Sequence, residues 1–314
     1  MWFKNVRLLT LEKPVTFNEE QLAQQLALLA FKPCPKSLPS SYGFVPPMGG
    51  DDAPLVHGSQ GCLLIRLRIE EKVLPPSVVR ERLAEDIKQF EQAAGRRIYK
   101  DEKERMKDEV YQTLLTKAFS KSSYVNGYID TKQRWLIVDT ASSKKLAHFA
   151  SLLNKCIDNV AFGPELESIP PLVTQWLVKN NYPSTLSFAQ ACLMKEPGEQ
   201  GGVVRVRNTD LQSDKVQSFL KDGSLVMQLA LEWSNQIRFT LKEDFSLSGI
   251  KFLESIKDLA RDGMSETKEE RFAADFIIMV QTLRQFLGEM LLCFGVQSHS
   301  TQKVVKDVAV NANA

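Results

Sequence analysis

The 314-residue sequence lacks the marks of several protein classes. It has no Gly-x-y repeat, and at 43% hydrophobic residues it is too apolar for a disordered chain. No stretch approaches the roughly 20 apolar residues that a helix needs to cross a bilayer, so we expect no membrane contact. The N-terminus from Met1 to Arg7 is charged within four residues and has no continuous apolar region, which predicts a cytoplasmic protein without a signal peptide.

Histidine and cysteine are scarce and scattered. The three histidines, His57, His148 and His299, are isolated from one another in the sequence. A metal centre usually draws on clustered His, Cys and carboxylate side chains, so we expect neither a metal site nor a cofactor. The five cysteines are odd in number, far apart and without a Cys-x-x-Cys pair, which is typical of reduced thiols in a cytosolic protein.

Common catalytic motifs are also missing. The chain has no Walker A loop, no Gly-x-Gly-x-x-Gly and no Gly-x-Ser-x-Gly. A metal-dependent nuclease needs closely placed carboxylates, often with a nearby lysine, and Asp130-Thr131-Lys132 and Asp101-Glu102-Lys103 match only the shortest form of that pattern. Such tripeptides arise by chance in a chain that is 25% charged. We therefore expect no catalytic residues, and the alternative is a metal-dependent nuclease or other DNA-processing enzyme that uses Asp130 or Asp139.

Neither sign of charge dominates, because 40 Lys and Arg residues oppose 38 Asp and Glu residues and leave a net charge of +2. This total argues against a nucleic-acid-binding domain, which is usually basic. A total does not show how the charges are distributed, however, so the exclusion depends on their arrangement.

The periodicity of apolar residues predicts an α+β fold of antiparallel sheets flanked by helices, in an elongated monomer with several lobes. A capping box at Thr16 and Glu19 predicts a first helix, and the Pro- and Gly-rich residues 33–61 predict a long loop. The expected strands are 2–11, 62–69, 124–130, 134–139, 203–207, 225–232 and 237–241. The further helices are expected over 76–94 (ending at Gly95), 96–115, 142–156, 245–257 and 267–290.

Two stretches share one layout, a β-hairpin followed by a helix, at 124–156 and 225–257. Together with the helical C-terminal part they suggest a division of the chain. We expect an N-terminal α/β part of a central region (1–75), charged helices with the first hairpin-helix lobe as a tip or gate (76–160), and a second α+β lobe (161–262). A long helix that could form the base of a dimer (263–297) and a flexible tail (298–314) follow.

A cluster of cationic residues lies between positions 96 and 121. Arg96, Lys100, Lys103 and Lys107 recur at i, i+4, i+7 and i+11, which would place them on one side of a helix; Arg97, Lys117 and Lys121 lie close by. Such a row suits phosphate neutralisation. The alternative is a solvated helix with internal ion pairs, for example between Asp101 and Arg105.

Two further features fit the same interpretation. The strand 203–207 carries Arg205 and Arg207 on one face, as 62–69 carries Arg66 and Arg68, although each pair could also be the polar side of a half-buried strand. Phe119 lies between Lys117 and Lys121, where a helix is expected to give way to a loop, and an exposed aromatic there could insert into a partner or stack on a base.

An ordered set of segments resembles the family of the recombination-associated protein RdgC. The segments are Met1–Asn5, Gly43–Pro47, Gly95–Glu109, Leu114–Phe119, Leu136–Lys145, Gly201–Arg205, Leu229–Trp233 and Ile250–Leu253. No single segment is diagnostic, but together they extend in order over the chain up to its tail.

The resemblance implies a protein of the bacterial nucleoid that binds DNA without marked sequence preference. It implies a ring-shaped homodimer that surrounds duplex DNA, with single-stranded DNA as the open alternative. It also implies functional antagonism of RecA, and direct contact with RecA stays open. The charged helix of residues 96–121 would line the hole or close its gate, although Tyr99, Asp101 and Glu102 dilute its charge. Phe119 and the apolar stripe from Phe272 to Met290 are candidate dimer contacts, and packing within the monomer explains the stripe equally well.

Overall fold

The computed structural model describes residues 1–50, 53–159, 161–164, 166, 168–198, 200–262 and 267–296, so the predicted tail and His299 lie outside the described residues. Within this part, twelve strands and eight helices form an α+β fold around a large antiparallel sheet, as the periodicity predicts. The strands are β1 (Asn5–Leu11), β2 (Ser40–Val45), β3 (Val56–Ser59), β4 (Cys62–Val73), β5 (Phe119–Asp130), β6 (Trp135–Val138), β7 (Ala161–Phe162), β8 (Leu186–Lys195), β9 (Val203–Arg207), β10 (Leu225–Trp233), β11 (Ile237–Lys242) and β12 (Leu247–Phe252). The helices are α1 (Glu19–Ala27), α2 (Pro76–Ala94), α3 (Lys100–Lys117), α4 (Ser143–Ile157), α5 (Ile169–Lys179), α6 (Asp214–Lys221), α7 (Glu254–Asp262) and α8 (Lys268–Cys293).

The short first strand joins the two halves of the sheet. The strand order is β2-β4-β5-β6-β1-β12-β11-β10-β8-β9, with β3 paired to β4 and β7 paired to β1. Asn5 and Val6 pair with β12, and Arg7 to Thr10 pair with β6. The N-terminal segment therefore holds together parts of the chain that are more than 100 residues apart.

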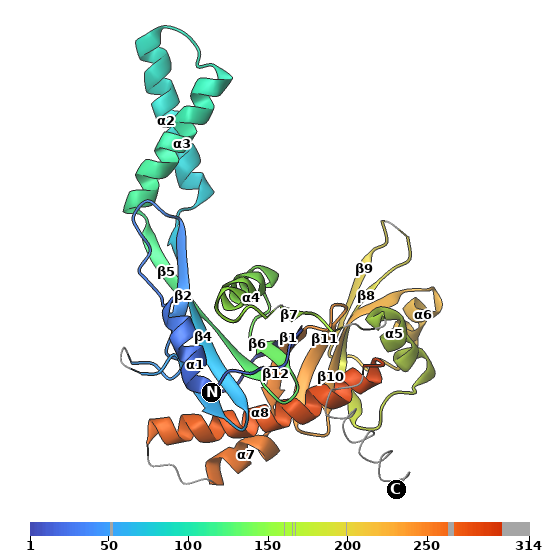
Figure 1. The fold of residues 1–314 in the computed structure, drawn as a ribbon. Helices are drawn as coiled ribbons and strands as arrows, with labels where there is room; N and C mark the ends of the chain where they lie inside the picture. The colour runs from blue at the N-terminus through green and yellow to red at the C-terminus, as the bar shows by residue number, and fades with distance from the viewer. Residues whose placement is uncertain are drawn as a thin grey trace.

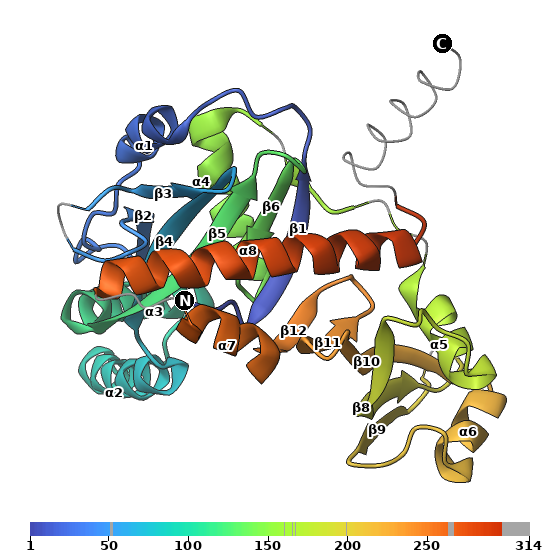
Figure 2. The same ribbon diagram turned by 90° about the horizontal axis from the view of Figure 1, so that it is seen from below.

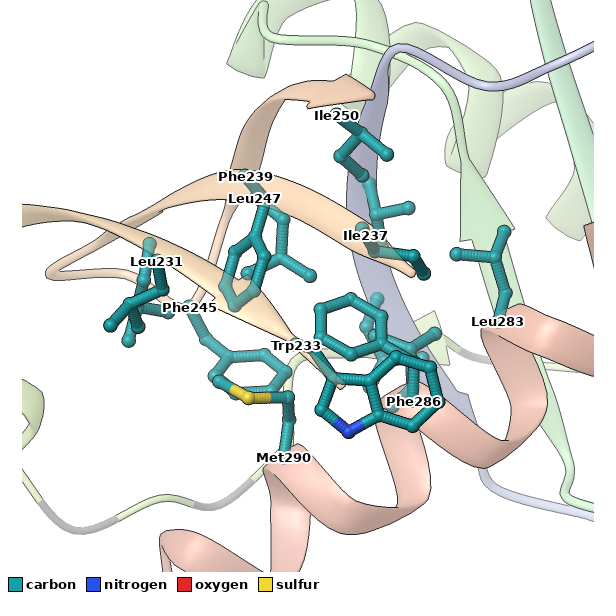
Figure 3. Packing of buried hydrophobic residues seen from close by; sticks show 14 of the residues in the cluster. Leu231, Trp233, Ile237, Phe239, Phe245, Leu247, Ile250, Leu283, Phe286 and Met290 are labelled. Carbon is teal, nitrogen blue, oxygen red and sulfur yellow. The ribbon is translucent and has the colours of Figure 1, made fainter. Parts of the chain in front are cut away.

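The long helix α8 runs across one face of both halves (Figures 1 and 2). It begins at the predicted capping box, in which Thr267 accepts a hydrogen bond from the Glu270 N–H and Glu270 accepts one from Thr267. Its apolar stripe packs on the sheet: Phe286 lies 5.3 Å from Trp233 and 4.8 Å from Phe239 between ring centroids (Figure 3). Although α8 is long and apolar enough to cross a membrane, nine of its side chains are buried in this core.

The burial of this stripe bears on the two explanations that the sequence leaves open. Phe276, Met279, Leu283 and Phe286 are fully buried, and Met290 is 1% exposed. Packing within the monomer therefore accounts for these side chains, while Phe272 at the start of the stripe is half-buried, and the role of the helix as a dimer base stays a prediction.

Strand alternation gives the sheet two faces with separate cores. Cys62 and Leu64 of β4 point into the core under α8, whereas Leu63, Ile65 and Leu67 point the opposite way. Helices α1 and α4 cover this second face over β2, β4, β5 and β6, and helices α5, α6 and α8 all lie on the first face. The second face of β8 to β12 is left without a covering helix in Figure 1.

An arm of two antiparallel helices projects from one end of the sheet (Figure 1). Strands β4 and β5 pair over their full lengths, from Cys62 with Asp130 to Val73 with Phe119, and α2 and α3 continue from their ends. Gly95, at φ 66°, ends α2 as predicted. The helices hold each other by a small apolar cluster around Val79, Leu83 and Val110.

The structure corrects the prediction for residues 16–61. Helix α1 is capped by Asn18 and Gln21 instead of Thr16 and Glu19, since each of the former accepts a hydrogen bond from the backbone of the other. The predicted loop 33–61 contains β2 and β3. In β2, a Cβ on Gly43 would lie only 2.4 Å from the Cα of Phe31, so this glycine marks a close backbone approach within a strand.

Two further predicted elements are wrong. Residues 245–257 form strand β12 followed by α7 instead of one helix, so the second hairpin does not repeat the layout of the first. The chain around Phe119 is the start of β5 and not a loop, because a single residue, Ala118, separates it from α3.

Candidate nucleic-acid interface

The uncovered face of β8 to β12 is polar. Leu229, Leu231 and Trp233 of β10 point into the core, so the alternate residues Gln228, Ala230 and Glu232 face outward. A shallow hollow of about 210 Å³ lies on this outward face, between Arg205 and Arg207 on one side and Gln228 and Thr240 on the other. We call the outward side of β8 to β12, together with the exposed side of α4, the open face.

Arg205 and Arg207 lie on the open face as the alternation predicts. Both are exposed on β9, opposite Leu193 and Ala191 of β8. Neither forms an ion pair with another described residue. Their guanidinium groups are therefore free to meet an anion from solution.

Helix α4 adds cationic residues that the sequence reasoning missed. It carries Lys144, Lys145 and Lys155 and has no acidic residue within its bounds. Phe149, Leu152 and Leu153 anchor it on the sheet, so the exposed residues Lys144, Ser151 and Lys155 point away from the sheet. Lys144 is 3.6 Å from Glu71, but both side chains are largely exposed and the pair is weak. The sequence does contain a signal for this cationic surface, namely a predicted helix with three lysines and no acidic residue.

Arg96 does not belong to the cationic row of α3. The helix begins at Lys100, so Arg96 precedes it, where its guanidinium binds both carboxylate oxygens of Glu102, at 2.9 and 2.7 Å. The same group lies over the rings of Tyr99 and Phe90, at 4.6 and 5.2 Å. The hydrogen bonds from Arg96, followed by the one from the Tyr99 N–H, lower the pKa of Glu102 to about 2. Arg96 thus closes the turn between the arm helices.

The remaining lysines of the row do share one side of α3. Lys100, Lys103 and Lys107 are exposed, Arg97 is exposed in the preceding turn, and none forms an ion pair with another described residue. Their effect is diluted, because residues 76–117 contain ten Lys and Arg against nine Asp and Glu. The arm as a whole is nearly neutral.

Phe119, Lys117 and Lys121 lie together at the root of the arm. Phe119 is 88% exposed, and its cross-strand partner Val73 is 50% exposed. Lys117 lines a cavity of about 300 Å³ between α2 and α3, and Lys121 pairs in register with Glu71. This group is at the opposite end of the sheet from Arg205 and Arg207, so one chain does not bring the predicted residues into a single cluster.

The nuclease candidates Asp130 and Asp139 both have structural contacts. Asp130 is buried and accepts hydrogen bonds from Arg284 Nε at 2.6 Å and from the N–H groups of Lys132 and Gln133. Asp139 accepts hydrogen bonds from Asn5 and from the Lys4 N–H. Burial raises the pKa of Asp139 against the opposing effect of those bonds. Among the residues that the structure describes, no group of three or more His, Cys, Asp or Glu side chains could hold a metal ion.

Comparison with known proteins gives two kinds of match. The family model described as "Putative exonuclease, RdgC" matches residues 1–297. A protein of Aeromonas hydrophila named recombination-associated protein RdgC is 34% identical over 302 residues, which is 96% of this chain and 100% of that relative. Proteins of the same name from Halorhodospira halophila and Tolumonas auensis are 35% and 34% identical over 297 residues, or 94% of this chain and 98% of each relative.

Proposed function

The chain belongs to the RdgC family of recombination-associated proteins, and on that premise we propose that it binds duplex DNA through the open face without sequence preference. The observation that carries the proposal is the arrangement of cations on this face. Lys155 of α4 and Arg205 and Arg207 of β9 are exposed, and none forms an ion pair with another described residue. Phosphate neutralisation depends on free cations at the binding surface more than on a high net charge.

The predicted mode of binding is encirclement by a dimer. In Figure 1 the arm and the β8–β9 end rise on the same side of α8, with α4 between them. A two-fold axis would join the arm of one copy to the arm of the other and the β9 end to the β9 end, which closes a ring around the open face.

Each of these ends has a feature suited to contact. At the root of the arm, Phe119 of β5 is 88% exposed. Strand β9 pairs only with β8 among the described strands, so its outer edge has free backbone groups, and Val203 on it is 63% exposed. Both features support the proposed dimer.

The biological role that we propose is restraint of RecA in the nucleoid. A ring around duplex DNA occupies the molecule that a recombinase filament must invade, so antagonism requires no direct contact with RecA. This part of the proposal depends on the resemblance to the family and on the names of the relatives.

The test of encirclement compares closed circular with linear DNA of the same length. A closed ring can leave linear DNA over its ends but must open to leave a circle. We therefore expect complexes formed at low salt to survive a high-salt wash on circles and to be lost from linear DNA. Equal loss from both would contradict encirclement and leave an open binding groove.

The name of the family model raises a second candidate function, an exonuclease. The structural roles of Asp130 and Asp139 favour binding over cleavage. Incubation of the pure protein with end-labelled duplex and Mg²⁺ or Mn²⁺ tests this directly. If the wild type shortens the labelled strand and Asp139→Asn does not, the non-catalytic proposal is overturned.

A further inference from the structure

A second cationic site lies away from the open face. A cavity of about 310 Å³ opens between the N-terminal segment, the end of β12 and the start of α7. Its floor is apolar: Phe3, Ile250 and Phe252 are buried, and the Trp2 ring packs on Phe252 with 4.7 Å between centroids. Helix α7 lies beside α8, on the opposite side of the sheet from α4, so DNA on the open face would leave this cavity accessible (Figures 1 and 2).

Lysines surround this apolar floor. Lys4 and Lys251 line the cavity, are exposed and form no ion pair with another described residue. Lys257 also lines it and is 3.1 Å from Glu254, the one acidic residue of the lining. The rim therefore carries a net positive charge around a hydrophobic centre.

We propose that this cavity binds an acidic peptide segment of a partner protein, which inserts one bulky apolar side chain between Trp2 and Leu253 and places its carboxylates on Lys4 and Lys251. The charge of the rim selects acidic residues, and the apolar floor selects the inserted side chain. The volume is at the lower end of the roughly 300–1,000 Å³ of small-molecule pockets, so it suits a side chain.

A nucleic acid fits this cavity less well than a peptide. Single strands bind on exposed aromatic faces that stack against successive bases. Here the Trp2 ring is tilted by 51° against Phe252 and packs on it, so the two rings form no flat platform. The inference goes beyond DNA binding, and either can fail without the other.

The test uses a fluorescein-labelled synthetic peptide of four aspartates followed by Gly-Leu-Phe. Its anisotropy should rise to saturation with the full-length protein, and the fluorescence of Trp2 should change. Trp135, Trp176 and Trp233 are at most 5% exposed and should contribute little to that change. A peptide with Ser in place of Leu and Phe, and one with Asn in place of Asp, should both bind at least about tenfold more weakly.

Two matched charge reversals locate the site. Lys4→Glu with Lys251→Glu should weaken peptide binding by about tenfold or more and leave duplex binding unchanged. Lys155→Glu with Arg207→Glu, an equal change in net charge, should do the reverse. Both lysines of the first variant are exposed, and an unchanged thermal midpoint shows that it folds.

Three results would overturn the proposal. They are no saturable binding of the peptide, equal binding by the wild type and the Lys4→Glu/Lys251→Glu variant, and displacement of the peptide by a single-stranded oligonucleotide. The last result would assign the cavity to nucleic acid.

Discussion

Arg284 of α8 donates a hydrogen bond from Nε to the buried carboxylate of Asp130, at 2.6 Å, and so joins positions 154 residues apart. Nη2 of the same guanidinium donates hydrogen bonds to the Gln60 carbonyl and to the Cys62 sulfur. This contact fixes the long core helix to the turn between β5 and β6. The turn belongs to the half of the sheet that contains β4, β5 and β6, and α8 also packs on β10 and β11 of the other half, so the pair links both halves of the sheet.

Removal of the Arg284 side chain should be costly. In Arg284→Met, Asp130 would keep a buried charge without its cation, which typically costs about 3–5 kcal/mol of unfolding free energy. Urea denaturation measures the loss. The control is Lys144→Met, which breaks an exposed pair with Glu71 and should cost about 1 kcal/mol or less. Equal losses in the two variants would contradict a special role for the buried pair.

Cysteine reactivity should follow burial. Burial, followed by the nearby Asp130 charge, raises the pKa of Cys62 to about 12, and burial raises the pKa of Cys192 to about 11. Both groups are thus protonated and shielded at pH 8, where the thiolate is the reactive form. A maleimide should leave both unmodified in the native protein and label all five cysteines in guanidinium, as read by peptide mass spectrometry. Rapid native labelling of Cys62 would show that α8 opens.

Acid should destabilise the protein through His57. Its ring lies against Phe272 and Phe276, and its buried Nε2 has no hydrogen-bond partner among the described residues. Burial lowers its pKa below 6.5, against a smaller opposing effect of Glu19. Between the folded and unfolded pKa values the unfolded chain binds more protons, so the unfolding free energy falls as the pH drops below about 6.5.

The variant His57→Leu isolates that contribution. Its unfolding free energy, measured by urea denaturation at pH 7.5 and 5.5, should fall less than that of the wild type over this interval. The same decrease in both proteins would assign the acid sensitivity to other groups.

Neutralisation of the open face should change the salt dependence of DNA binding. Lys155→Gln and Arg207→Gln should each lower affinity for all duplex sequences, and the slope of log K against log salt should become less negative by about 0.9 for each lost phosphate contact. Arg96→Gln is the matched control, because Glu102 already occupies that guanidinium. A larger effect of Arg96→Gln than of the other two would move the binding site to the arm.

Phe119 should matter for association and not for folding. Because its side chain is 88% exposed, Phe119→Ala should leave the thermal midpoint unchanged while weakening the dimer in sedimentation experiments. Leu292→Ala, at a position 50% exposed at the end of α8, controls for the loss of a surface apolar group. A dimer constant unchanged in Phe119→Ala would exclude the arm root as a contact.

The elements that the sequence predicts best are those in which local signals and core packing agree. In α8 the capping box at Thr267 and the stripe from Phe272 to Met290 specify the same helix. Gly95 ends α2 for a local reason, its positive φ. The prediction fails at Gly43, which is typical of a loop in sequence but lies in a strand because the Phe31 backbone needs the space. That Phe31 lies beside Gly43 becomes known only from the fold.

The candidate site was predictable only in part, for a similar reason. Alternation along 203–207 placed Arg205 and Arg207 on one face of β9 correctly. The helical spacing that included Arg96 was wrong for two reasons: the chain turns between Gly95 and the start of α3 at Lys100, and the Arg96 side chain is hydrogen-bonded to Glu102. The lysines of α4 were missed because their exposure depends on which side of the helix packs on the sheet. That side is the one with Phe149 and Leu153, which are buried.

The arm leaves and re-enters the sheet at one cross-strand pair, Val73 and Phe119. Its length is therefore uncoupled from the register of β4 with β5, and no core residue has to move when residues are gained or lost between these two positions. Evolution can lengthen, shorten or exchange the helical hairpin while the sheet is inherited unchanged. The reach of the arm is thus a trait on which selection can act separately from the stability of the core.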